Sequence, residues 1–255
     1  YDLDTRYLTK LIRDRGAIGA KAAKMMRHAK AQESRLEREI EKREALMHDV
    51  EYDERLKLHP EPYFRQNLLL SKDLSIFYGD RCVANGISLT LNRGDRIALV
   101  GRNGCGKSSL LKLLIGQPIA HTGTLEIGSR LTVSYVPQDM SFLSGSADDF
   151  AAESEIDITL FKTILRKLDF KRTQFTKDMS EFSMGQKKKV LLARSLCQRA
   201  NLYIWDEPLN YIDVISRLQI ETLILEYKPT MLFVEHDEAF VNDIATKVCR
   251  ISLNQ

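Results

Sequence analysis

The sequence predicts an α/β fold with a mostly parallel sheet, preceded by a long helical segment. Short apolar runs typical of buried strands are each followed by a polar or glycine-rich stretch, at residues 97–100, 131–136, 202–205 and 231–235. Stretches with helical spacing of leucines lie between these runs, as in a chain that alternates strands and helices. No proline precedes Pro60, and the residues before it are rich in Lys, Arg, Glu, Ala and Leu.

The composition is typical of a soluble globular protein, with 44% hydrophobic and 29% charged residues in a chain of 255. The net charge of +3 does not by itself indicate a polyanionic partner. No apolar run approaches the roughly 20 residues that a membrane-crossing helix needs, and there is no signal-peptide pattern. The four cysteines have no metal-ligand spacing, so we expect free thiols in a reducing cytosol.

Residues 1–58 form the predicted helical arm. Small or apolar residues recur in it at three- and four-residue steps, the spacing of a narrow helical seam. They are Ala22, Met25, Ala29 and Leu36. The two prolines of His59-Pro-Glu-Pro62 end the helix. We expect residues 59–67 to connect the arm to a second domain at 68–255.

Basic residues three positions apart share one face of the predicted arm: Lys21, Lys24, Arg27 and Lys30. Such a face is often only a solvated surface. The alternative is a sequence-independent contact with the phosphate backbone of a nucleic acid, here an RNA contact.

The most informative stretch is Gly101-Arg-Asn-Gly-Cys-Gly-Lys-Ser-Ser109, which fits the pattern G-x-x-x-x-G-K-[ST] between a predicted strand and a predicted helix. Its glycines let the backbone wrap closely, so that N–H groups point into one anion-sized hollow at a helix N-terminus. We expect the Lys107 ammonium to bind nucleotide phosphates and the Ser108 hydroxyl to bind Mg²⁺. The predicted phosphate-binding residues are Gly101, Asn103, Gly104, Cys105, Gly106, Lys107, Ser108 and Ser109.

Polar side chains follow three of the predicted strands. Gln138 follows residues 131–136, Asp206 and Glu207 follow 202–205, and His236 follows 231–235. In an α/β sheet the carboxyl ends of the strands face the ligand crevice. We expect Asp206 to hold Mg²⁺ through water and Glu207 to deprotonate an attacking water. An ordinary turn would also accept two carboxylates, but their position after a phosphate loop favours the functional interpretation.

Two further stretches bear on a nucleotide. Tyr78 ends a predicted strand at 73–78, where it either stacks on a base or, like most strand aromatics, belongs to the core. Ser183-Met-Gly-Gln186 precedes a helix that reaches about Cys197, with three lysines, 187–189, near its start. Lysines at a helix N-terminus oppose the helix dipole, which suits a nearby anion better than it suits stability.

In this order, the stretches resemble the ATP-binding-cassette (ABC) superfamily over residues 68–255. The resemblance implies a P-loop NTPase fold with a mostly parallel RecA-like core sheet, an antiparallel β subdomain and a helical subdomain at about 145–200. It implies ATP and Mg²⁺ as cofactors, adenine stacking on Tyr78, sensing of Mg²⁺ and the lytic water by Gln138, and a switch role for His236. Asp206 and Glu207 match the Walker B carboxylates. The implied metal ligands are Ser108, Gln138 and Asp206.

Phe182-Ser-Met-Gly-Gln186 stands where the family has its L-S-G-G-Q signature. Met184 replaces the first signature glycine, a departure expected to hinder closure and turnover. Ser183, Gly185 and Gln186 remain available to a γ-phosphate. The resemblance implies that this signature faces the nucleotide of a second cassette, and that Asp213 lies in the loop between cassettes. One cassette then cannot complete a site alone.

Two features are similar to the ABC-F group of soluble twin cassettes that act on the ribosome. The stretch Glu207-Pro-Leu-Asn-Tyr-Ile-Asp213 resembles E-P-T-N-H-L-D, and the basic arm resembles the second arm of that group's inter-domain linker. Phe233-Val-Glu-His-Asp237 further resembles the antibiotic-resistance members. Because the chain begins at Tyr1, it is expected to be a C-terminal cassette with part of the linker, paired with an N-terminal cassette or with itself.

The sequence thus predicts a cytoplasmic ATPase whose closure acts on the ribosome, with rRNA or tRNA as partner, in antibiotic resistance by ribosome protection. One alternative is the ATPase subunit of an ABC membrane transporter, which leaves the basic arm unexplained. Another is a regulatory protein that binds ATP without cycling, for which Met184 is the only support.

Overall fold

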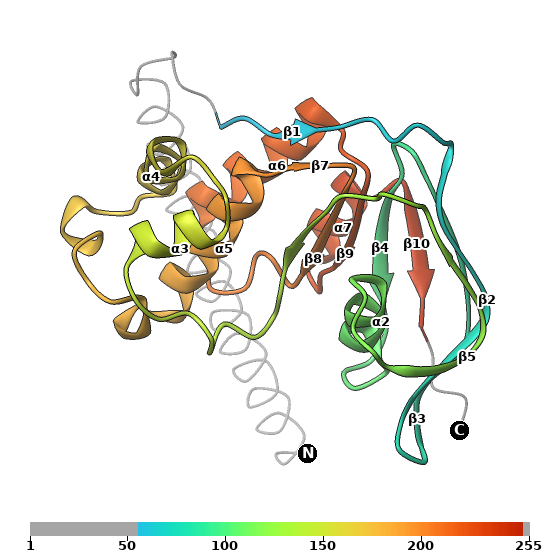
Figure 1. Ribbon diagram of the computed structural model, residues 1–255. Helices are drawn as coiled ribbons and strands as arrows, with labels where there is room; N and C mark the ends of the chain where they lie inside the picture. Colours follow the sequence, from blue (N-terminus) through green and yellow to red (C-terminus); the bar gives the residue numbers. More distant parts are fainter. Residues whose placement is uncertain (1–55, 252–255) are drawn as a thin grey trace, which may run out of the picture. The chain divides into compact units, whose positions relative to one another are not determined.

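The computed structural model describes residues 56–251 (Figure 1). They belong to the second of two compact units, Tyr1–Arg55 and Leu56–Gln255. The predicted helical arm, with Lys21, Lys24, Arg27 and Lys30, lies outside the described residues except for residues 56–58. These three residues are not helical, and Leu56 and Leu58 are buried in the core.

A five-stranded parallel sheet forms the centre of this unit, in the order β10-β4-β9-β8-β6 (Figure 1). Its strands are β4 (Arg96–Val100), β6 (Val133–Val136), β8 (Leu202–Asp206), β9 (Met231–Val234) and β10 (Lys247–Arg250). The first four match the apolar runs of the sequence, which confirms the predicted mostly parallel core. β10 was missed because three of its four residues are exposed, so it shows no apolar run.

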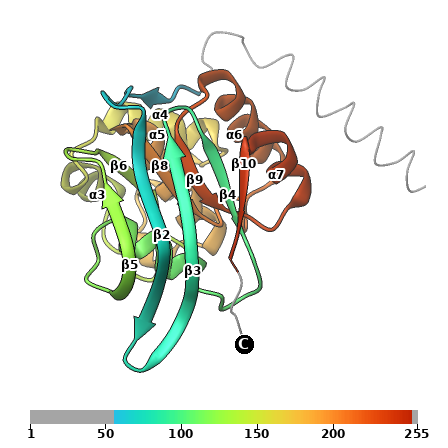
Figure 2. The same cartoon turned by 90° about the vertical axis from the view of Figure 1, so that its right-hand side faces the viewer.

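An antiparallel sheet lies beside this core, in the order β3-β2-β5 (Figure 2). Its strands are β2 (Asn67–Tyr78), β3 (Arg81–Asn92) and β5 (Ala120–Ile127). Of β2 the sequence indicated only residues 73–78, which end at Tyr78. It gave no signal for β5, since seven of that strand's eight residues are exposed and alternation is therefore absent.

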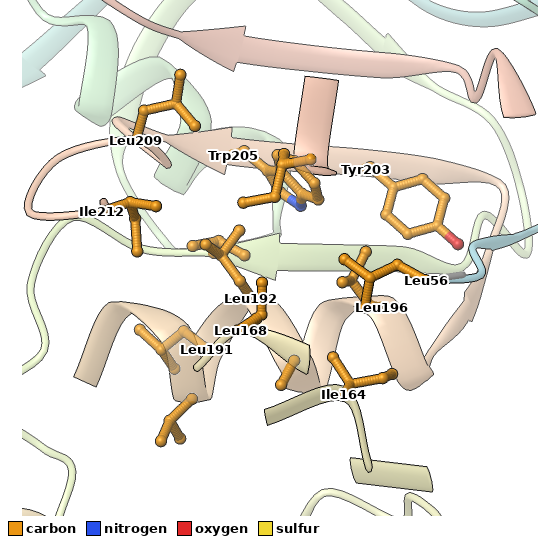
Figure 3. Close-up of a cluster of buried hydrophobic side chains, with 14 of the residues drawn as sticks. Leu56, Ile164, Leu168, Leu191, Leu192, Leu196, Tyr203, Trp205, Leu209 and Ile212 are labelled. Atoms are coloured by element: carbon orange, nitrogen blue, oxygen red, sulfur yellow. The ribbon is translucent and has the colours of Figure 1, made fainter. Parts of the chain in front are cut away.

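Side chains of the central strands alternate between two hydrophobic cores, one on each face of the sheet. Ile97 and Leu99 pack with α2 (Lys107–Leu114) and the antiparallel sheet, whereas Ala98 faces the other core. Tyr203 and Trp205 of β8 also face that second core, where Figure 3 shows them above leucines of α5 (Met184–Cys197). Because successive strand residues point to opposite faces, one buried strand contributes to both cores.

The remaining helices pack on that second face and begin at polar caps. They are α3 (Ala147–Glu153), α4 (Ile158–Lys167), α6 (Val214–Tyr227) and α7 (Glu238–Ile244), with two 3₁₀ turns at Arg172–Gln174 and Met179–Glu181. Ser146, Asp157, Asp213 and Asp237 each accept a backbone N–H in the first turn of the helix they cap. No helix among the described residues is long and apolar enough to cross a membrane.

The segment 59–67, predicted as a connector, is fastened to the rest of the unit. β1 (His59–Pro60) pairs in parallel with β7 (Arg199–Ala200), just after α5. Tyr63 is 2% exposed and its hydroxyl donates to the Ser129 carbonyl at 2.8 Å.

Candidate nucleotide-binding and hydrolysis site

Four loops meet at the carboxyl edge of the central sheet, because β4, β6, β8 and β9 are parallel. β4 leads into the phosphate loop, β6 into Gln138, β8 into Glu207 and β9 into Glu235 and His236. The topology therefore places the predicted polar residues at one edge.

The phosphate loop holds its own lysine. Lys107 is 7% exposed, and its ammonium donates to the carbonyls of Gly101 at 2.8 Å and Arg102 at 3.1 Å. The cap of α2 is Gly106, so no side chain occupies the free N–H groups of the first turn, and no acidic residue lies there. A phosphate can take both the N–H groups and the ammonium.

Two glycines of this loop are required by close contacts. A Cβ on Gly101 would lie 2.4 Å from the Ile251 carbonyl oxygen. A Cβ on Gly106, whose φ is +87°, would lie 2.6 Å from the Ala84 Cβ. Ala84 pairs with Ile76, two residues before Tyr78 on β2. Because Gly106 of the phosphate loop lies against Ala84, the end of β2 that carries the half-exposed Tyr78 is the end close to the loop.

Asp206 is a buried carboxylate without a partner. It is 1% exposed, and neither side-chain oxygen has a hydrogen-bond partner. Burial raises the pKa of Asp206, while the nearby Ser108 hydroxyl and the ammonium groups of Lys188 and Lys107 act in the opposite direction. Such an orphaned carboxylate beside a hydroxyl fits a cation, and Mg²⁺ commonly binds through one or two protein oxygens plus nucleotide phosphates.

Glu207 is held from three directions. One oxygen accepts from the Gln138 amide at 2.9 Å and from the Asn210 amide at 2.6 Å. The other lies 3.4 Å from Nε2 of His236. The backbone of Glu207 has a φ of +50°, a left-handed conformation that non-glycine residues adopt rarely and at functional sites. The predicted catalytic residues Gln138, Glu207 and His236 are thus brought together.

Glu235 fastens the loop that follows Glu207. It is 5% exposed and accepts the backbone N–H of Leu209 at 3.2 Å and that of His236 at 2.9 Å. The sequence analysis included Glu235 in the strand 231–235 and assigned it no role. The available signal was that a charged residue ends an otherwise apolar run.

Helix α5 begins at the signature stretch, in which Ser183 and Met184 are exposed. Ser183 caps the helix by accepting the Gln186 N–H, and the Gln186 side chain accepts the Ser183 N–H in return. Met184 is 48% exposed. A Cβ on Gly185 would lie 2.6 Å from the Tyr211 carbonyl oxygen, so the chain requires a glycine there.

Two of the three lysines at the start of α5, which the sequence suggested would suit a nearby anion, have partners within this chain. Lys189 forms a 2.6 Å ion pair with Asp213, and Lys188 is 1% exposed. Sequence reasoning missed both roles. The helical period did contain the signal, because Lys188 lies three and four residues before the buried Leu191 and Leu192.

The signature and the phosphate loop are not joined by any hydrogen bond or ion pair among the described residues. Nor do those residues contain a cluster of three or more His, Cys, Asp or Glu side chains able to hold a metal. The described cysteines are unpaired thiols, at 82, 105, 197 and 249.

A model of the ABC transporter family matches residues 84–210, which include the phosphate loop, Gln138, the signature stretch and both carboxylates. The chain therefore carries an ATP-binding cassette of the ABC transporter family. The solved structure of an ATP-binding subunit of an ABC transporter has the same fold. Its TM-score is 0.61 at 22% identity, over 73% of this chain and 88% of that one.

Three individual proteins similar in sequence to this chain are YdiF, VmlR and an F family member of the ABC transporters. The chain is 36% identical to the ATP-binding protein YdiF of Bacillus subtilis, over 72% of this chain and 30% of YdiF. It is 27% identical to the ribosome protection protein VmlR of the same species, over 92% of this chain and 43% of VmlR. It is 29% identical to ABC transporter F family member 2 of Arabidopsis thaliana, over 73% of this chain and 28% of that protein. The chain spans less than half the length of these relatives.

Proposed function

We propose that this cassette hydrolyses ATP together with a second cassette. The observation that carries the proposal is the setting of Glu207, a carboxylate oriented by Gln138 and Asn210 beside the orphaned carboxylate of Asp206. A general base must be held within reach of a water, and the two amides fix one oxygen of Glu207 while the other lies 3.4 Å from Nε2 of His236.

Ser108 and Asp206 would hold Mg²⁺, with Gln138 reaching it from the neighbouring strand. Bound Mg²⁺ supplies neutralisation of the charge on the β- and γ-phosphate oxygens. Lys107 and the N–H groups at the start of α2 orient the phosphates, and Glu207 takes the proton from the attacking water. Tyr78 stacks on the adenine.

Exchanging Glu207 for Gln tests this proposal. Glu207→Gln should retain ATP binding, because the amide keeps the size of the side chain. It should slow hydrolysis by about 10²–10⁴-fold, the usual contribution of a general base. Steady-state phosphate release, measured with the second cassette present, reports the rate, and calorimetric titration reports binding. Unchanged turnover would rule out Glu207 as the base.

We further propose that the cassette belongs to an ABC-F protein that acts on the ribosome in the cytoplasm and protects it from antibiotics. The loop from Glu207 to Asp213 supports this, as does the likeness to VmlR. That likeness covers 92% of the chain, so it extends into the segment before Leu56 that carries the basic residues. YdiF and the F family member cover about three quarters of the chain or less.

Ribosome binding is tested by sedimentation through a sucrose cushion. Because Glu207→Gln traps the ATP state, it should sediment with ribosomes in ATP and stay in the supernatant in ADP. The control Lys107→Ala, which weakens the phosphate site, should stay in the supernatant in both. Equal sedimentation in ATP and ADP would contradict the proposal, and recovery with a membrane partner instead would favour a transporter subunit.

The basic arm has a separate test. Neutralising Lys21, Lys24, Arg27 and Lys30 to Gln should weaken ribosome binding and flatten its salt dependence, by roughly 0.7–0.9 units of log–log slope per lost phosphate contact. The matched control neutralises the exposed Lys171 and Lys177 of the cassette. If both variants keep the wild-type slope, the arm is a solvated face.

A further inference from the structure

Lys188 is a buried lysine that contacts two of the strand ends described above. Its ammonium donates to the Pro137 carbonyl at 3.1 Å and to the Asp206 carbonyl at 3.3 Å. Those carbonyls immediately precede Gln138 and Glu207 in the chain. One side chain of α5 therefore joins the two backbone positions from which the catalytic amide and carboxylate project.

The burial of Lys188 is not explained by packing. Lysine is almost never fully buried unless it is paired, because a charge loses its hydration in the interior. The next buried residues of α5, Val190 to Ala193, are apolar, and an apolar side chain at 188 would fill the same space. The ammonium lies near the buried Asp206 carboxyl, and its two donor bonds go to the ends of β6 and β8.

The same turn of α5 is fixed to the loop after Glu207. The Tyr211 carbonyl approaches Gly185 so closely that no Cβ fits, and Lys189 pairs with Asp213 at 2.6 Å. The first two turns of α5 therefore contact the loop after Glu207 at two positions, Gly185 and Lys189. A displacement of the helix start cannot leave the ends of β6 and β8 where they are unless the Lys188 bonds break.

We propose that Lys188 is a positioning residue that couples the signature end of α5 to Gln138 and Glu207. The inference rests on the proposed ATPase function. When the signature engages a nucleotide held by a second cassette, Lys188 carries the shift of α5 to both carbonyls and sets the 2.9 Å contact between Gln138 and Glu207. Hydrolysis in this cassette thereby depends on occupancy of the other.

The test replaces Lys188 with Met, which keeps the length of the apolar stem and removes the donors. In the complete two-cassette protein, Lys188→Met should lower kcat by about 10- to 100-fold, the effect of misplacing a catalytic group by about 1 Å. KM for ATP should stay within about threefold, because Lys188 touches no residue of the phosphate loop by hydrogen bond. Lys188→Arg, which keeps the charge and donors, should recover part of kcat.

A second readout separates coupling from folding. In the Glu207→Gln background, Lys188→Met should still close the cassettes in Mg-ATP, measured by fluorescence transfer between dyes on the two cassettes. The matched control is Lys162→Met, which removes a partly exposed lysine of α4 that pairs with Asp148, and which should leave both kcat and closure unchanged. Melting temperatures establish that each variant is folded. If Lys188→Met fails to fold, Lys188→Gln, with one donor group, gives the same comparison.

Two results would overturn the inference. One is a folded Lys188→Met protein with wild-type kcat. The other is a loss of kcat and a rise of KM in parallel, with closure lost as well, which would make Lys188 a residue of the fold alone. Failure of the ATPase proposal is distinguishable, because it requires normal turnover in Glu207→Gln whatever Lys188 does.

Discussion

The chain contains two helix starts suited to anions, and they differ in how their N–H groups are satisfied. Helix α2 begins at Gly106 without any side-chain cap, and the loop before it is stabilised from inside by the buried Lys107. Helix α5 begins at Ser183, and a capping box with Gln186 occupies two N–H groups there, those of Ser183 and Gln186. The first helix start offers all its free N–H groups to a ligand, whereas the second already uses part of its own.

The difference indicates what each region needs from outside the chain. The phosphate loop has all its glycines, its lysine and its backbone contacts in one chain, so binding of phosphate requires no partner. At the signature, Ser183 and Met184 are exposed, and the Ser183 hydroxyl accepts the Gln186 N–H. If this helix start binds a phosphate through Ser183 or Gln186, a hydrogen bond within the Ser183–Gln186 capping box must be exchanged for one to the ligand. Such an exchange gains little until a second cassette brings the nucleotide there.

The largest effect on ATP affinity is expected from removing Lys107, the lysine of the phosphate loop. Lys107→Ala should weaken ATP binding by about 10- to 100-fold, because a charge-assisted hydrogen bond to phosphate is lost. Calorimetric titration measures the affinity. Lys112→Ala, in the last turn of the same helix, is the matched control and should bind as the wild type does. An ATP affinity of Lys107→Ala within twofold of the wild type would contradict a phosphate site built on Lys107.

Two glycines of the phosphate loop give a sharper contrast within one region. Both have positive φ, but a Cβ meets Ala84 and the Val83 carbonyl at Gly106, whereas nothing lies within 4 Å at Gly104. The left-handed backbone costs each alanine variant about 1–2 kcal/mol of unfolding free energy. Gly106→Ala should lose more than Gly104→Ala because of the added clash. Urea unfolding measures both, and equal losses would contradict the close packing against β3.

At the signature, restoring the missing glycine should raise activity. Met184→Gly removes an exposed side chain at the first position of α5 and frees backbone N–H access for a phosphate. The turnover of the two-cassette protein should rise by about three- to fivefold, which corresponds to one hydrogen bond of roughly 1 kcal/mol. Met184→Ala should give a smaller rise. A fall in turnover with Met184→Gly would mean that the thioether helps closure.

The smallest effect concerns the Asp213 loop. Burial raises the pKa of Asp213, but hydrogen bonds from Lys189 and Ser216 outweigh it, so the pKa lies below its usual value. A depressed carboxyl pKa stabilises the fold above the unfolded-state value near 4 and loses that contribution as pH falls through the folded value. Since the carboxyl is partly exposed, Asp213→Asn should cost less than about 1 kcal/mol at pH 7.

The matched measurement for Asp213 is the difference in melting temperature between wild type and Asp213→Asn across pH. It should be largest near neutrality and shrink in the acid range. A difference that is constant from pH 7 to pH 3 would show that the Asn effect is steric and not electrostatic.

Whether the position of a site residue can be predicted from the sequence depends on whether its contacts are local in the chain. The phosphate loop is a local motif, and the polar tips of strands follow from where apolar runs end, so Lys107, Gln138 and Glu207 were predictable. Glu235 acts through a contact with Leu209 that depends on which strands are neighbours, and no pattern in the chain states that β8 lies beside β9. Asn210 contacts Glu207 only three residues away, but which side chain of the loop turns toward the carboxylate depends on the loop's conformation. Lys188 was missed because the position of the three lysines at a helix start favoured an anion contact, although the helical period places Lys188 on the face of the buried Leu191 and Leu192.

The edge strands were missed for a different physical reason. β5 and β10 are mostly exposed, so neither alternation nor an apolar run marks them, and they are defined by backbone pairing with β2 and β4. Sequence patterns report burial, and an exposed strand has little of it.

We propose that this chain supplies half of each nucleotide site in a pair of cassettes: the phosphate loop of one site and the signature stretch of the other. The most direct measurement is the ATPase rate per molecule of the 255-residue chain as a function of its concentration, with the mass followed by analytical ultracentrifugation. The account predicts ATP binding by the monomer with negligible turnover, and turnover that appears only where a second cassette, added or self-supplied, associates. A monomer that hydrolyses ATP at a rate independent of its concentration would contradict it.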